Sequence, residues 1–256
     1  MKPPTIPVDA TFFSSIACLP DAVIYRLFSF VQLEQLILLS KTCWLTRYLV
    51  RFYSIRAWSF YGFFRRWFTD SRAFQRMLER TRAVISGSQV VQFFDRAYYP
   101  ESDLDIYVQY GFRLGGVSRR SSSGPITRIL NLEKDETLWD GTTIRKRIQI
   151  IGLDVQPLNH ILFEFHSTAV MNFMTANVAV SVFPKLTFID RMSLALKAPK
   201  KKNSIDEKLP WQDKYRDRGF HMVHEGPTSF LETRLGRRSA VDCKSWKMPL
   251  GRESFV

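Results

Sequence analysis

The chain has 256 residues with 37 Lys and Arg against 24 Asp and Glu, a formal net charge of +13, and 45% of its residues are hydrophobic. This composition excludes a disordered chain, and the charge favours an anionic partner (nucleic acid, nucleotide or an acidic protein face) unless it serves general solubility alone. The three cysteines are far apart and argue against a disulfide framework, and no apolar stretch is long enough to span a membrane, so we expect a cytoplasmic or nuclear protein.

The first 60 residues predict a flexible leader and then a helical unit. Residues 1 to 15 contain three prolines and no apolar core. From residue 16 to 60 we expect three short helices, the first opened by Pro20, because proline is tolerated in a first turn. In this helix Ile24, Leu27, Phe28 and Val31 recur at helical spacing and predict one apolar stripe. A second helix is expected from 33 to 39, and a third from 42 to 52.

The helical unit resembles an F-box. The matching residues are Leu19-Pro20, the stripe from Ile24 to Phe30, the run from Leu36 to Trp44, and Leu49-Val50. In that family the Leu-Pro pair and the first two helices dock onto the Skp adaptor of a cullin–RING ubiquitin ligase. The resemblance therefore implies that Leu19, Pro20, Ile24, Leu27 and Phe28 contact an adaptor. The alternative is a plain helical subdomain that packs on the rest of the chain.

Residues 61 to 82 are predicted to form a helical junction. Its first part, from Tyr61 to Phe68, interleaves aromatic residues with two arginines. Such rings can stack on nucleic-acid bases, but we favour rings buried at a junction because no RNA-binding signature accompanies them. Ser71 is expected to cap a helix that runs to Arg82, with Phe74, Met77 and Leu78 facing inward.

The remainder predicts a mixed α/β domain over 83 to 195, so that the whole chain is of the α+β class. Strands are expected at 83–85, 104–108, 147–151 and 170–174, a helix at 89–96, and a basic, serine-rich loop at 115–125. Residues 196 to 210 read as a basic linker, which is either a solvated connection or a nuclear address. The aromatic residues of 211 to 256 indicate a C-terminal segment packed on the body.

A Gly-Ser turn and a pair of aspartates carry the clearest chemical signal. Gly87-Ser88 follows the first expected strand and opens a helix, where backbone N–H groups can bind phosphate. Asp103 and Asp105 are two residues apart on the next strand, so their carboxylates face the same side and can share Mg²⁺ ions. The alternative is that Gly87 only makes a turn and that the aspartates only keep a strand end hydrated.

This arrangement resembles the nucleotidyltransferase superfamily, whose signature is a Gly-Ser turn followed by an Asp-x-Asp strand. The resemblance implies that Gly87 and Ser88 contact the phosphates of a nucleoside triphosphate, and that Asp103 and Asp105 hold Mg²⁺. Further blocks are similar to a fungal lineage that joins an F-box-like N-terminus to such a domain. They are 82–88, 92–96, 99–108, 165–168 with 171–172, 215–220 and 245–250.

The predicted active site lacks its third carboxylate. Family members carry that acid on a later strand, where this chain has Gln149, and Asp154 lies five residues farther on. In the block that begins at Phe165, many relatives have an aspartate where this chain has His166, a poor ligand for Mg²⁺. We therefore expect an interaction protein with an inactive binding domain that recruits an unknown client to a ubiquitin ligase. The alternatives are an active nucleotidyltransferase acting on protein, RNA or a small molecule, and a basic RNA-binding module.

Overall fold

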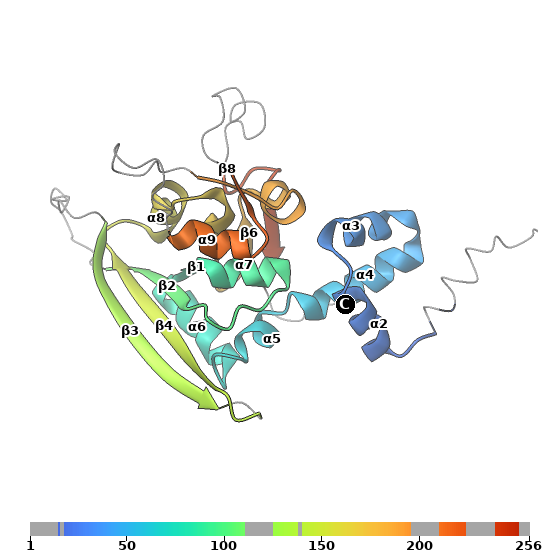
Figure 1. Cartoon of the computed structure of the whole chain (residues 1–256), viewed down its shortest axis with the longest axis horizontal. Helices are drawn as coiled ribbons and strands as arrows, with labels where there is room; N and C mark the ends of the chain where they lie inside the picture. Colours follow the sequence, from blue (N-terminus) through green and yellow to red (C-terminus); the bar gives the residue numbers. More distant parts are fainter. Residues whose placement is uncertain are drawn as a thin grey trace, which may run out of the picture. The chain divides into compact units, whose positions relative to one another are not determined.

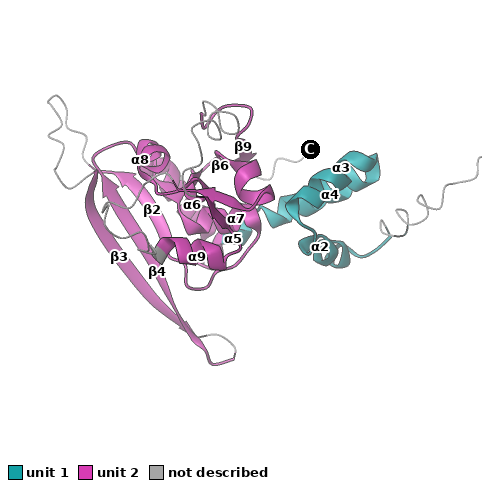
Figure 2. Ribbon diagram, turned by 45° about the horizontal axis from the view of Figure 1, so that its top comes forward, with its two compact units in different colours: residues 1–63 teal, residues 64–256 magenta. Residues whose placement is uncertain are grey.

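The computed structural model describes residues 15, 18–110, 125–137, 140–195, 210–223 and 239–250. These residues divide into two compact units, 1–63 and 64–256, which are described separately below (Figure 2). The predicted leader, the serine-rich loop and the basic linker lie almost entirely outside the described residues. In the part that is described, no helix is both long and apolar enough to cross a membrane.

Three helices make up most of the described part of the N-terminal unit. They are α2 (Asp21–Ser29), α3 (Leu33–Thr42) and α4 (Trp44–Ala57), and α5 (Phe60–Phe64) follows at the end of the unit. Pro20 is the N-cap of α2 and makes no side-chain capping hydrogen bond. Asp21 and Glu34 place acidic side chains at the positive ends of α2 and α3. The core is centred on Tyr53, whose ring lies 5.1 Å from that of Tyr25 and 5.8 Å from that of Phe28.

The first helix has apolar residues on two sides, which differs from the single predicted stripe. Ile24 is 3% exposed and belongs to the core of the unit, whereas Leu27 is 49% exposed. Leu27 instead continues an outward row that begins at Val23 and ends at Phe30, because residues four and three apart return to the same side of a helix. The structure therefore removes Ile24 from the expected surface contacts and leaves Leu27 on the surface.

The larger unit is mixed α and β, as expected, and its elements follow in chain order. The helical segments are α6 (Ser71–Thr81), α7 (Ser88–Asp95), α8 (Pro157–Glu164), η1 (Thr168–Val170), η2 (Lys185–Ile189) and α9 (Pro210–Asp217). The strands are β1 (Val84–Ser86), β2 (Leu104–Gln109), β3 (Ile126–Thr137), β4 (Thr143–Leu153), β5 (Asn172–Met174), β6 (Val178–Ser181), β7 (Met192–Leu194), β8 (His221–Val223) and β9 (Trp246–Pro249).

Seven of these strands form one mixed sheet in the order β3-β4-β2-β1-β5-β6-β9. The β2 and β4 strands run parallel, and every other neighbouring pair in this sheet is antiparallel. The parallel pair is possible because the chain crosses over through β3 before it enters β4. Figure 1 shows β3 and β4 as a long hairpin at one edge of this unit. The β7 and β8 strands form a separate parallel pair.

The core of the larger unit lies on both faces of the sheet. On one face, α8 packs through Ile161 against Val84, Tyr107 and Ile151. Elsewhere in the unit, Phe94 of α7 contacts the rings of Phe188 and Trp246. Burial of this apolar surface is the main stabilising contribution to such a fold. This packing fixes the strand ends near α7, where the candidate site lies.

Most predicted elements of this unit are found within a few residues of their expected positions. Strands were expected at the places of β1, β2, β4 and β5, and a helix at the place of α7. The helix after residue 70 is capped by Asp70 instead of Ser71, since the Asp70 carboxylate accepts a 2.8 Å hydrogen bond from the Ala73 amide. The aromatic stretch before it is packed as predicted, with Phe68 stacked on Phe74 at 4.0 Å. The predicted boundaries between the junction, the mixed domain, the linker and the C-terminal segment, all within 64–256, remain predictions.

Candidate functional site

The Gly-Ser turn directly contacts the second aspartate. Gly87 has φ +75° and ψ −151°, a backbone conformation that essentially only glycine adopts. A Cβ at this position would lie 2.7 Å from Oδ2 of Asp105, so the glycine is required by space as well as by conformation. Ser88 then begins α7 and is 6% exposed. The turn, the amino end of α7 and the carboxylate therefore meet in one place.

Strand register brings Gln149 beside the same carboxylate. Asp105 pairs with Ser86 of β1 on one side and with Gln149 of β4 on the other. Paired residues in neighbouring strands point to the same face of a sheet. The sequence prediction that Gln149 occupies the neighbouring-strand position is confirmed. The position where a third acid is expected thus carries a neutral amide, which can neither add charge for a second metal ion nor act as a base.

Two cations of the chain itself interact with the aspartates. Nε of Arg147, two residues before Gln149, lies 3.2 Å from Oδ1 of Asp103. The ammonium of Lys214, which α9 brings from the C-terminal segment, interacts electrostatically with both Asp103 and Asp105. Burial, then repulsion by Arg218, lowers the pKa of Lys214. In a metal-bound site of this kind, divalent ions would supply these positive charges.

Asp105 is the more perturbed of the two acids. Burial, and then repulsion by Asp103, raise its pKa to about 7, against the opposing attraction of Lys214 and Arg147. Its Oδ1 is buried and accepts no hydrogen bond from any residue in the described part of the chain. A buried carboxylate with an unsatisfied oxygen is unfavourable, and such groups are concentrated at functional sites. Asp105 is therefore a group that a ligand, a proton or a cation would stabilise.

Buried amides hold the loop before β2 against α7. Gln89 donates to the carbonyl of Ser102 and accepts a 2.7 Å hydrogen bond from Arg66. Gln92 accepts a hydrogen bond from the backbone amide of Tyr99. Burial lowers the pKa of Arg66 to about 10. These contacts fix the short connection that leads into Asp103, and so they position the acids relative to the Gly-Ser turn.

A buried arginine fixes the C-terminal helix over this loop. The side chain of Arg218 is 4% exposed and donates to both Glu101 and Ser102 at 2.7 Å. Its guanidinium carbon lies 4.1 Å from the centre of the Tyr99 ring. Because Arg218 directly follows α9, it also fixes the position of Lys214 one turn earlier. The C-terminal segment is thus part of the site.

The remaining candidate acids and the histidine lie elsewhere. Asp154 follows the last residue of β4, about 16 Å along the strand from Gln149 at 3.3 Å per residue. Glu164, the next acidic residue along the chain after Asp154, ends α8 and is exposed. His166 stacks on Trp211 of α9 at 4.0 Å, so it contributes packing near the C-terminal helix. No cluster of three or more His, Cys, Asp or Glu with metal-binding geometry occurs within the ranges that the structure describes.

Comparison with protein-family models, curated proteins and solved structures finds no match to this chain.

Three residues of the site were missed by the sequence analysis. Arg147 could have been found. It lies two residues before Gln149, just as Asp103 lies two residues before Asp105, and Gln149 pairs with Asp105. Arg218 lies in the similar block 215–220, but nothing in that block connected it with the acids, and Lys214 carried no signal at all. They lie more than 100 residues after the acids and reach the site only because the chain folds α9 back over it.

Proposed function

We propose that this chain is an interaction protein, in which residues 1–63 dock onto a Skp-type adaptor of a cullin–RING ubiquitin ligase. The larger unit is proposed to act as a nucleotidyltransferase-like binding module without catalytic activity, and it would hold the client. The observation that carries the proposal is a second, outward apolar row on the helices of the smaller unit.

Those outward rows are unusual for a helix surface. On α2 the row consists of Val23, Leu27 and Phe30, which are 42%, 49% and 70% exposed. On α4, Trp44 and Tyr48 are 78% and 60% exposed and lie one turn apart. A surface helix of a folded unit normally has one apolar face, directed to its core. Exposed apolar side chains gathered on one small unit are typical of a surface that binds another protein.

The resemblance to an F-box supports the choice of a Skp-type adaptor as the proposed partner. In that family the first helices, preceded by a Leu-Pro pair, make the adaptor contact. Leu19 is partly exposed and Pro20 exposed, ahead of the outward row of α2. This chain's Leu27 and the row that it belongs to are therefore the proposed adaptor contacts.

The chemistry of the larger unit supports a binding role over catalysis. Two-metal transfer needs carboxylates that hold both ions and activate the attacking hydroxyl. Here Gln149 replaces one of them, and Arg147 pairs directly with Asp103. A metal would have to displace that guanidinium and approach Lys214. One Mg²⁺ with a nucleoside triphosphate at Gly87 and Ser88 remains the weak ligand that we propose for this site.

Adaptor binding by the full chain tests the proposal. The purified chain is captured on beads and incubated with a purified Skp-type adaptor, beside an F-box protein that is known to bind it. We expect capture by the wild type and its loss in the double variant Leu27→Asp/Phe30→Asp, because charge replaces the outward row without entering the core. Val241→Asp is the matched control, since Val241 is 78% exposed and belongs to the larger unit.

Two outcomes would contradict the docking proposal. One is that the wild type does not bind where the reference F-box protein does. The other is that the double variant binds as well as the wild type. Circular dichroism of each variant separates loss of binding from loss of folding.

A second candidate function is an active nucleotidyltransferase, and the contact between Gly87 and Asp105 favours it. Incubation of the chain with labelled nucleoside triphosphates and a cell extract tests this activity. Labelling of an acceptor that disappears in Asp103→Ala would establish the enzyme over the binding module.

A further inference from the structure

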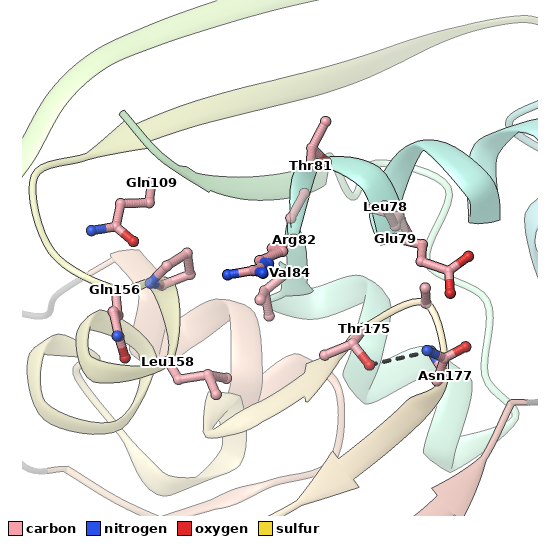
Figure 3. Close-up of a pocket in the computed structure, with 13 residues that line it drawn as sticks. Leu78, Glu79, Thr81, Arg82, Val84, Gln109, Gln156, Leu158, Thr175 and Asn177 are labelled. Atoms are coloured by element: carbon pink, nitrogen blue, oxygen red, sulfur yellow. Dashed lines mark hydrogen bonds between the residues drawn. The ribbon is translucent and has the colours of Figure 1, made fainter. Parts of the chain in front are cut away.

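A pocket of about 480 Å³ lies on the larger unit, away from the acidic pair. Its walls come from the carboxyl end of α6, the start of β1, the end of β2, the amino end of α8 and the turn between β5 and β6 (Figure 3). Its volume is within the range of small-molecule sites. None of Gly87, Ser88, Asp103 and Asp105 lines it. Gln109, at its rim, is about 13 Å along β2 from Asp105.

The pocket is lined by apolar side chains and by an arginine. Leu78, Val84 and Leu158 supply the apolar surface. Figure 3 shows the side chain of Arg82 directed toward Gln109 and Gln156, while Glu79 lies on the other side of the view. Arg82, Gln109 and Gln156 all line this pocket.

The backbone of Arg82 is fixed at the end of α6, and its side chain is exposed. It adopts the left-handed conformation, with φ 51°, and its backbone amide bonds to the carbonyl of Glu79. Within the ranges that the structure describes, Arg82 makes no ion pair, and its guanidinium donates no hydrogen bond. The side-chain amides of Gln109 and Gln156 can donate hydrogen bonds to the same anion. The amino end of α8, which begins at Pro157 on the same wall, adds positive potential.

We propose that this pocket binds a small organic anion, with its carboxylate or phosphate group at Arg82 and its apolar body against Val84 and Leu158. The guanidinium pairs with either headgroup through two parallel hydrogen bonds. The apolar surface accommodates a short hydrocarbon body, and the two glutamine amides complete the headgroup contacts. This site is independent of the adaptor surface and of the acidic pair.

Calorimetric titration of the full chain with short ligands of equal length tests the proposal. The probes are hexanoate, hexyl phosphate, hexanamide and hexylamine. We expect both anions to bind about two- to fivefold more tightly than the uncharged amide, because only the anions form an ion pair with the exposed guanidinium. The stronger of the two anions identifies the headgroup, and the amine is expected not to bind.

Two arginine variants assign binding to the pocket. Arg82→Gln is expected to reduce anion affinity about two- to fivefold. Arg80→Gln is the matched control, because Arg80 lies on the same turn of α6, is exposed, and does not line the pocket. The proposal is overturned if neither anion binds at millimolar concentration, if hexanamide binds equally well, or if Arg82→Gln binds like the wild type.

Discussion

Asp105 is predicted to destabilise the larger unit whenever it is ionised. Burial and the neighbouring Asp103 raise its pKa from 3.8 to about 7. The folded chain therefore keeps this proton to higher pH than the unfolded chain does. Stability is unaffected by the group below about pH 4, falls as the pH rises toward 7, and stays lowered above it. At 1.36 kcal/mol for each pH unit, the ionised carboxylate costs about 4 kcal/mol at pH 8.

Asp105→Asn removes the charge and keeps the size of the side chain. We expect the variant to be more stable than the wild type by about 2 kcal/mol at pH 5 and about 4 kcal/mol at pH 8. Urea unfolding in metal-free buffer measures both values when it is followed by circular dichroism in the β-sheet region, since all described strands belong to the larger unit. The matched control is Asp217→Asn, because Asp217 is exposed and its removal should change neither value by more than about 0.5 kcal/mol. A destabilised Asp105→Asn, or an advantage that does not grow with pH, refutes the reasoning.

Three further substitutions test separate parts of the structure. Gly87→Ala should lower the free energy of unfolding in urea by about 1–3 kcal/mol, because the backbone conformation is forbidden to alanine and the new Cβ would contact Asp105. Gly141→Ala is the control and should lower it less, since Gly141 has φ +81° but open space around it. Equal losses would contradict the close approach of Gly87 to Asp105. Arg218→Met should lower the free energy of unfolding by about 1–3 kcal/mol and speed amide hydrogen exchange in residues 210–220 and 99–105. Arg216→Met is the control and should do neither, because it removes only an exposed ion pair with Asp213. Ile24→Ala should cost about 2–4 kcal/mol in the smaller unit and Leu27→Ala under about 1 kcal/mol, and the reverse order would refute the assignment of core and surface.

The sequence predicted the central strands because their signals are local. Gly87, Asp103 and Asp105 lie on short, strongly patterned segments, so that strand, turn, helix and strand follow in order. The position of Gln149 followed from the same order once the two strands were expected to be neighbours. These features need only the periodicity of the chain and the chemistry of a turn.

What could not be predicted depends on contacts distant in sequence. Lys214 reaches the acids only through the packing of α9, which Arg218 fixes by pairing with Glu101. The separation of Leu27 from Ile24 was missed for another reason. Helix α2 has apolar residues on two sides, and periodicity alone does not tell which side faces the core. The long β3 strand is exposed along almost its whole length and gave no burial pattern that could be recognised.

For the binding module of the larger unit we propose that Arg147 and Lys214 supply the positive charge that metal ions would otherwise bring to Asp103 and Asp105. Titration of Mg²⁺ against the melting temperature, with a nucleoside triphosphate present, tests this most directly in the wild type and in Arg147→Ala/Lys214→Ala/Gln149→Glu. We predict that Mg²⁺ leaves the melting temperature of the wild type nearly unchanged and raises that of the triple variant. The triple variant has a third carboxylate at the site and lacks the two cations. A wild type that is stabilised by Mg²⁺ as strongly as the triple variant would contradict the account.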